Sequence, residues 1–244
     1  MTTRRFLILR LEGPLLAFGG VTIDQVGVTR DFPAVSMLTG LFANALGYRR
    51  KDVEAHQRLQ DRLVFAARRE RENPLGLLTD TQNAQLEKND RGWTTHGHPE
   101  GRDGASYGAP HRLLRDYHAD ACVTVALTLD PADEAPKVEA LAEALDRPAR
   151  PLFIGRKSCL PSGRIFQTLL MADTAHAALS HVPAVETGNG VMAAQWPPGE
   201  GPQSGPDVDR ITRLADLRNW NTGLHGGSRA IVEGRIAVAA EAGQ

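Results

Sequence analysis

The residues with the most specific chemistry lie in FIGRKSCLPSGRIF, residues 153–166, which carries three positive charges and no acid. Its two glycines let backbone N–H groups approach an anion closely, and its two serines add neutral donors. Forked guanidinium, ammonium and hydroxyl groups together are what a phosphate backbone requires. The GxxxxGK[ST] spacing of a nucleotide P-loop is absent. The segment therefore predicts an anion-binding loop, although an ordinary solvated basic loop would have the same composition.

A second set of candidate residues lies in the polar stretch that starts near position 75. His96 and His98 form an HxH pair, a spacing that metal ions can use. Trp93 and Tyr107 lie in the same stretch, and flat rings among basic residues also stack the bases of single-stranded RNA. Surface imidazoles on a polar loop explain the pattern as well, and we expect neither a metal site nor a cofactor.

Catalytic patterns are weaker. The chain has no GxSxG motif, and Cys159 has no general base at a fixed spacing. A metal-independent ribonuclease needs only a base and a cationic stabiliser, and His118 with Arg115 could supply them. Nothing in the sequence demands this activity, so it stands as an alternative.

Bulk composition limits the possible classes of protein. The chain has 244 residues, 41% of them hydrophobic, and a formal net charge of -1. A packed core is expected, and any nucleic-acid binding must depend on local charge. The sequence has no apolar stretch of membrane-span length and no signal-peptide core, and its two cysteines form no CxxC pair. We therefore expect a cytoplasmic protein with reduced thiols.

Elements that would position these residues can be recognised from periodicity. Residues 5–11 are apolar on both strand faces, which predicts a central strand. Ser36 is predicted to cap a helix that Gly47 ends. Further elements are expected as a helix from Asp52, strands over 63–68 and 121–129, and a helix over 138–145.

The order of these elements predicts the fold class. Strand, helix, strand, long arm, strand and helix form an α+β pattern with a mostly antiparallel sheet, which suits a ferredoxin-like fold. The arm spans about 75–117 in a first unit of residues 1–150. Residues 151–244 are richer in Pro and Gly, with short β segments and a surface loop near 197–207, and are expected to form a smaller β-rich region.

Several segments, in this order along the chain, resemble the Cas-five family, the RAMP-superfamily subunit of type I-E CRISPR Cascade. They are RFLILRLEGPLLAFGG, DFPAVSMLTGLFANALG, LLTDTQNA, RDYHADACVTVALTL, RPLFIGRKSCLPSGRIF and SRAIVEGRIAV. The first of these segments and the GRKSC motif are the most specific, and together the segments span nearly the whole chain.

The resemblance implies a RAMP domain with a β-hairpin thumb and a non-catalytic role in antiviral defence. The subunit would bind the 5′ handle of the CRISPR RNA, cap the backbone filament and contribute to RNA-guided DNA targeting. Implied partners are the backbone subunit, the large subunit and target DNA near the protospacer-adjacent motif, with no membrane. Some relatives cut RNA, so a metal-independent endoribonuclease that processes precursor CRISPR RNA is the alternative, with His118 as its base.

The resemblance also suggests the RNA-contacting residues. Arg156, Lys157 and Ser158 match the family's GR-basic-SC motif, and Arg164 follows in the same loop. Cys159 is then expected to be a packed neighbour of these residues rather than a nucleophile.

A further contact is implied at the first helix. Ser36 matches the family serine at its start, where the hydroxyl and the helix's free N–H groups could meet a phosphate. Val35 stands where the family usually has a basic residue, and Arg30 is expected to substitute for it.

Overall fold

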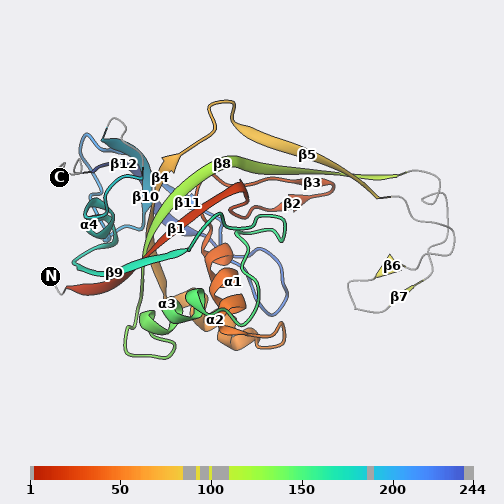
Figure 1. Ribbon diagram of the computed structural model, residues 1–244, viewed down its shortest axis with the longest axis horizontal. Helices are drawn as coiled ribbons and strands as arrows, with labels where there is room; N and C mark the ends of the chain where they lie inside the picture. Colours follow the sequence, from red (N-terminus) through yellow and green to blue (C-terminus); the bar gives the residue numbers. More distant parts are fainter. Residues whose placement is uncertain (1–2, 85–91, 94–98, 101–109, 186–189, 239–244) are drawn as a thin grey trace.

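The computed structural model describes residues 3–84, 92–93, 99–100, 110–185 and 190–238. In this part of the protein a large sheet is accompanied by few helices, which confirms the α+β class (Figure 1). The helices are α1 (Val35–Leu46), α2 (Val53–Arg62), α3 (Val138–Asp146) and α4 (Ala175–Ser180).

Most strands belong to one sheet, in the order β11-β12-β10-β4-β8-β1-β9. Strand β5 pairs with β8, β3 joins β2 to β8, and β6 pairs with β7 in a separate ribbon. The strands are β1 (Arg4–Leu16), β2 (Thr22–Ile23), β3 (Val26–Gly27), β4 (Leu63–Arg71), β5 (Leu77–Ala84), β6 (Gly92–Trp93), β7 (Pro99–Glu100), β8 (His111–Leu129), β9 (Phe166–Ala172), β10 (Val191–Trp196), β11 (Val208–Leu214) and β12 (Arg229–Ala237).

Strand β1 is central, as its two apolar faces predict. It pairs antiparallel with β8 on one side and with β9 on the other. Leu7, Leu9 and Leu11 belong to a core that includes residues of α1 and α3, whereas Phe6 and Ile8 belong to a core that includes residues of α4. Because successive side chains alternate across a strand, one segment supplies both cores.

Helix α1 ends as predicted but begins differently. Gly47 closes it in the left-handed conformation, at φ 82°. The N-cap is Ala34, which has no side-chain cap, so the prediction that Ser36 caps this helix is wrong. Instead, Val35 N–H donates to the carboxylate of Asp216 at 3.1 Å, and Ser36 N–H donates to the Asp216 carbonyl at 3.1 Å. Asp216, which is far away in the sequence, therefore caps the N-terminus of this helix.

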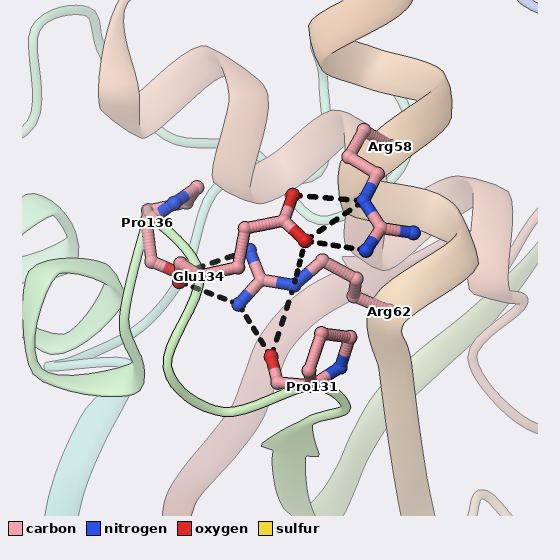
Figure 2. A network of polar contacts seen from close by, with 5 residues as sticks. All are labelled: Arg58, Arg62, Pro131, Glu134 and Pro136. Atoms are coloured by element: carbon pink, nitrogen blue, oxygen red, sulfur yellow. Dashed lines mark hydrogen bonds and ion pairs between the residues drawn. The ribbon is translucent and has the colours of Figure 1, made fainter.

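Helix α2 is fixed to the β8–α3 connection by one buried guanidinium (Figure 2). Arg62 is fully buried and donates to the carbonyls of Pro131 (2.8 Å), Glu134 (2.7 Å) and Pro136 (3.1 Å). The Glu134 carboxylate in turn accepts from Arg58 Nε at 2.8 Å. These contacts hold α2 in place. Two other side chains of this helix, His56 and Gln60, contact Trp220.

Strand β8 belongs to two environments. Its residues 121–129, predicted as a strand, lie between β1 and β4, while residues 111–118 pair with β5. This second part extends with β5 away from the helices (Figure 1). The predicted arm therefore starts as a two-stranded ribbon continuous with the central sheet.

Strands after residue 190 continue the same sheet, because β10 pairs with both β4 and β12. The unit boundary between residues 150 and 151 stays a prediction. None of the described helices is long and apolar enough to cross a membrane.

Candidate nucleic-acid interface

The basic loop of residues 153–166 is anchored to the end of β1. Ile154 and Cys159 are fully buried and joined by an N–H to carbonyl bond of 2.7 Å. Ala17 N–H donates to the Ile154 carbonyl at 3.3 Å. Two buried side chains thus fix the loop, and between them Lys157 and Ser158 are exposed.

Gly155 permits this close approach. It has φ +90°, and a Cβ built there would lie 1.7 Å from the Ala17 carbonyl oxygen. An L-residue could not adopt this position without displacing the backbone. The sequence predicted that this glycine would let an anion approach the backbone. In the structure, Gly155 lets the loop backbone approach Ala17, directly after β1.

Arg156 joins three segments of the chain. Its guanidinium donates to the carbonyls of Asp116 (2.8 Å), Gly27 (2.8 Å) and Val28 (3.2 Å) and lies 4.7 Å from the centre of the Tyr117 ring. The Nη1 and Nη2 groups of this guanidinium already have acceptors within the protein. Arg156 therefore builds the wall of the site in addition to any contact with RNA.

The other predicted loop residues differ in availability. Lys157 is exposed and has no hydrogen bond or ion pair within the described part of the chain. Ser158 is also exposed, with its Oγ 3.5 Å from the Tyr117 hydroxyl. Arg164 is paired with Asp146, its Nε lying 2.7 Å from a carboxylate oxygen. It lines a separate small hollow, so the structure does not bring it together with Arg156.

The start of α1 is not an open anion site. The expectation of free N–H groups beside Ser36 is wrong, because Asp216 accepts from Val35 and Ser36. Asp216 is fully buried and also accepts from Arg229 at 3.0 Å. This carboxylate already satisfies the positive end of the helix dipole.

His118 is buried and held by contacts within the protein. It is 5% exposed, and its Nε2 lies 2.7 Å from the Arg30 carbonyl, so that nitrogen must carry a proton to donate. Its ring lies 4.9 Å from the Phe18 ring. Arg115, the expected cation, donates to the Gln25 carbonyl at 3.0 Å. These contacts do not support the ribonuclease arrangement.

Arg30, expected to replace a base near Ser36, lies beside the segment that caps α1 but does not line the cavity that Arg156 lines. Its Nη2 donates to the Ala215 carbonyl, and the residue lines a different cavity from Arg156.

Cys159 is the packed neighbour that was expected. Burial is the main cause that raises the pKa of its thiol above the ordinary value. A thiol that resists ionisation is a poor nucleophile.

A cavity of about 340 Å³ opens between the glycine loop after β1, the first turns of α1, the 153–156 segment and a loop of residues 217–227. Its polar and aromatic lining residues are Thr22, Ser36, Phe153, Arg156, Arg218, Trp220 and His225.

A second hollow of about 380 Å³ shares Phe153, Arg218 and Trp220 with the first, so the two are adjacent. Its further polar and aromatic lining residues include Tyr48, Arg50, His56 and Arg150. No carboxylate lines either space among the described residues. We call the two together the basic groove.

Helix α2 positions the aromatic centre of the basic groove. The Gln60 side chain donates to the Arg218 carbonyl at 2.9 Å, and its Oε1 accepts from Arg218 N–H (3.1 Å) and Trp220 Nε1 (3.2 Å). The Trp220 ring lies 4.7 Å from His56 and 5.2 Å from the Arg218 guanidinium. Arg218 Nε is buried and has no acceptor within the described part of the chain.

Sequence reasoning missed this loop. Its text, LRNWNTGLHGG, interleaves basic and aromatic residues with Asn and Gly, which was the available signal. His225 completes it: burial, followed by the charges of Arg218 and Arg30, lowers the pKa of its imidazole. An anion bound beside His225 would favour its protonated form.

The other predicted candidates lie outside the described residues. They are His96, His98 and Tyr107.

Comparison with known proteins adds independent evidence. A family model described as "CRISPR-associated protein (Cas_Cas5)" matches residues 6–232. The CRISPR system Cascade subunit CasD of Escherichia coli (strain K12) is 31% identical over 181 residues, which are 74% of this chain and 78% of that protein.

Two solved structures share the fold. A chain of a CRISPR RNA-guided surveillance complex matches with a TM-score of 0.68 and 24% identity, over 96% of this chain and 90% of that chain. A Cas protein solved by crystallography matches with a TM-score of 0.57 and 22% identity, over 97% and 96% of the two chains. Since the family model spans most of the sequence, this chain belongs to the Cas-five family of CRISPR-associated proteins.

Proposed function

We propose that this chain is a non-catalytic subunit of a type I-E CRISPR Cascade that binds the 5′ handle of the CRISPR RNA and caps the backbone filament. The observation that carries the proposal is the basic groove, which combines guanidinium groups with aromatic rings in a member of this family. The name of the Escherichia coli relative, a Cascade subunit, supports the same role.

The chemistry of the basic groove suits single-stranded RNA. Unstacked bases pack on aromatic rings and guanidinium planes, and arginine and lysine hold the phosphates. Trp220 and Arg218 would offer the stacking surfaces, and Lys157, at the exposed tip of the adjacent loop, would meet the backbone. Arg156 and Ser158 would support this contact. Ser36 also lines the groove and stays a predicted contact, while Arg164 and Arg30 stay predicted contacts outside the groove.

The sheet topology supports a ferredoxin-like RAMP domain. Chain order β1, α1, β4, β8, α3, β9 and sheet order β4-β8-β1-β9 form a βαββαβ unit with neighbouring strands antiparallel. On this proposal residues 1–150 carry most of that domain and residues 151–244 complete it and add the β-rich part.

The ribbon of β5 and β8 is the proposed base of the thumb, spanning about residues 75–117. Leu75, in the turn before β5, is 93% exposed, and Leu77 and Leu78 at the start of β5 are 46% and 43% exposed. Exposed apolar side chains at the base of a projecting ribbon suit packing against a neighbouring backbone subunit. The large subunit and target DNA near the protospacer-adjacent motif would be the other partners of this subunit at the capped end of the filament.

RNA retention by the assembled complex tests the proposal. We expect Lys157→Ala with Arg218→Ala to lower retention and to reduce the slope of affinity against salt by roughly one per lost phosphate contact. Arg5→Ala is the matched control, because Arg5 is exposed at the opposite end of β1 and paired with Glu139. Unchanged retention and salt slope in the double variant would contradict the proposed groove.

The ribonuclease alternative has its own assay. Purified protein incubated with precursor CRISPR RNA in EDTA should leave the RNA intact. Specific cleavage that survives in Lys157→Ala but not in His118→Ala would replace our proposal.

A further inference from the structure

A cavity of about 480 Å³ lies between β10–β12 and the segment of residues 20–32. We call it the acidic groove and define it by the lining residues Arg30, Asp31, Gln195, Asp209, Ile231 and Glu233. It lies on the sheet face that α1 covers elsewhere, because Gln195 and Ile231 alternate with Ala194 and Val232 of the opposite core. It is distinct from the basic groove, although both contact the glycine loop at Gly20 and Val28.

Two buried donors in the acidic groove lack acceptors within the described part of the chain. Gln195 is 3% exposed, and its Nε2 has no hydrogen-bond partner. Arg30 Nε is likewise buried and unpartnered, although its Nη2 donates to the Ala215 carbonyl. A buried amide or guanidinium N–H without an acceptor destabilises the fold. Both residues line the groove, so carbonyl oxygens entering it could satisfy these donors once the two side chains turn toward the opening.

The charged side chains around the groove indicate which class of ligand could supply these carbonyl oxygens. Glu233 accepts from Arg210 at 2.7 Å, and Asp209 lies 3.8 Å from Arg235, both in exposed positions where ion pairs contribute little. The Asp31 carboxylate is exposed and has no hydrogen bond or ion pair in the described part of the chain. Three carboxylates and one guanidinium line the cavity, and Arg210 and Arg235 pair with two of the carboxylates from outside the lining. Asp31 is therefore the lining carboxylate with the most charge left to attract a cation.

Apolar side chains border the same opening. Val21, Ile23 and Val28 are 40%, 69% and 43% exposed around the β2–β3 turn, and buried Ile231 forms part of the floor. Apolar contact, carbonyl acceptors and basic side chains occur together in an extended polypeptide, in which successive side chains point to opposite sides.

We propose that the acidic groove binds an extended, basic segment of a partner polypeptide. Its main-chain carbonyls accept hydrogen bonds from Gln195 Nε2 and Arg30 Nε, a small apolar side chain contacts Ile23 and Ile231, and Lys or Arg side chains meet Asp31 and Asp209. This site extends the proposed function, since it assigns protein binding to one cavity and RNA binding to the other.

Site-specific photo-cross-linking in the complex, purified through this chain, tests the site. A benzophenone residue in place of Ile23 should cross-link to a peptide of another protein subunit that carries Lys or Arg. The same residue in place of Ile211, which is 51% exposed on the opposite sheet face, is the control. Cross-links to RNA, to a second copy of this chain, or at the level of the Ile211 control would overturn the proposal.

Two variants add readouts that a folding defect would not reproduce. Asp31→Lys with Asp209→Lys should lower the Ile23 cross-link yield about tenfold while leaving RNA retention unchanged. Gln195→Leu should lower the yield while leaving the melting temperature of the isolated chain unchanged or higher, because it removes an unpartnered buried donor. Unaltered cross-linking in both variants would contradict the groove even where RNA retention supports the proposed function.

Discussion

At the scale of single residues, basic side chains of one loop serve the structure and, on our proposal, RNA recognition. Arg156 and Lys157 are adjacent in the basic loop, yet Arg156 donates to three carbonyls while Lys157 is exposed. The difference follows from side-chain chemistry, because a planar guanidinium can donate in several fixed directions to carbonyls around it. Charge counts along a sequence cannot separate these two roles.

Glycine at position 155 offers a direct stability test. We expect Gly155→Ala to lower the free energy of unfolding by about 3 kcal/mol, because both the positive φ and the contact with the Ala17 carbonyl oppose a Cβ. Gly163→Ala in the same loop is the control: a Cβ there meets nothing within 4 Å, so the change should stay within about 0.5 kcal/mol. Urea denaturation of both variants measures the difference, and equal midpoints would contradict the anchoring role.

His176 predicts a pH dependence of stability. Burial lowers the pKa of its imidazole below the ordinary value of 6.5, and the charge of Asp207 only partly opposes this shift. At a pH well above 6.5 the His176 imidazole is neutral in both the folded and the unfolded state. As the pH falls through this value, the unfolded state binds the proton more readily, so stability decreases.

Replacement of the imidazole should remove this contribution. We expect His176→Gln to lose less stability than the wild type between about pH 7.5 and about pH 5.5, measured by urea denaturation. Parallel pH curves for the two proteins would show that His176 does not titrate as described.

At the scale of elements, α1 depends on a residue far from it in sequence. Asp216 caps the helix, is fully buried and pairs with Arg229. The N–H groups at the start of α1 already have acceptors within the protein, so the helix N-terminus is not a free anion site. Its contacts with Asp216 instead fix the α1 side of the basic groove.

Removal of that carboxylate should be costly. We expect Asp216→Ala to lower the free energy of unfolding by about 3 kcal/mol, since it leaves the Arg229 guanidinium and the Val35 N–H without their carboxylate acceptor. Asp146→Ala is the control, because its pair with Arg164 is exposed and should contribute under about 1 kcal/mol. Thermal unfolding distinguishes the two, and a similar small loss in both would refute the capping role.

At the scale of the whole molecule, one sheet links the ribbon, the central core and the strands after residue 190. Two cavities of opposite charge lie beside the glycine loop that follows β1. A rigid sheet therefore sets the distance between a proposed RNA site, a proposed protein site and the projecting ribbon.

The exposed leucines of the ribbon carry the prediction at this scale. Leu75→Ser with Leu78→Ser should reduce assembly with the backbone subunit while changing the stability of the isolated chain by less than about 0.5 kcal/mol per site. Met171→Ser is the control, because Met171 is 52% exposed on β9 at the other edge of the sheet. Gel filtration of the mixed subunits reads the result, and full assembly of the leucine variant would argue against the thumb contact.

Local pattern was enough to predict much of the fold. The two apolar faces of β1, the glycine that ends α1 and the β-rich run in β8 are properties of neighbouring residues, so periodicity and turn chemistry reveal them. The family resemblance also followed from contiguous motifs, chiefly the opening strand with its glycine loop and the GRKSC loop.

Contacts between distant residues were decided only by the tertiary structure. The acceptors of Arg156, the capping of α1 by Asp216 and the hold of Gln60 on Trp220 each join residues separated by tens to well over a hundred positions. No period in the sequence encodes such pairings, because they depend on which surfaces the packed sheet and helices bring together. For that reason the sequence by itself determined a basic loop, while the structure decided which of its charges face a groove.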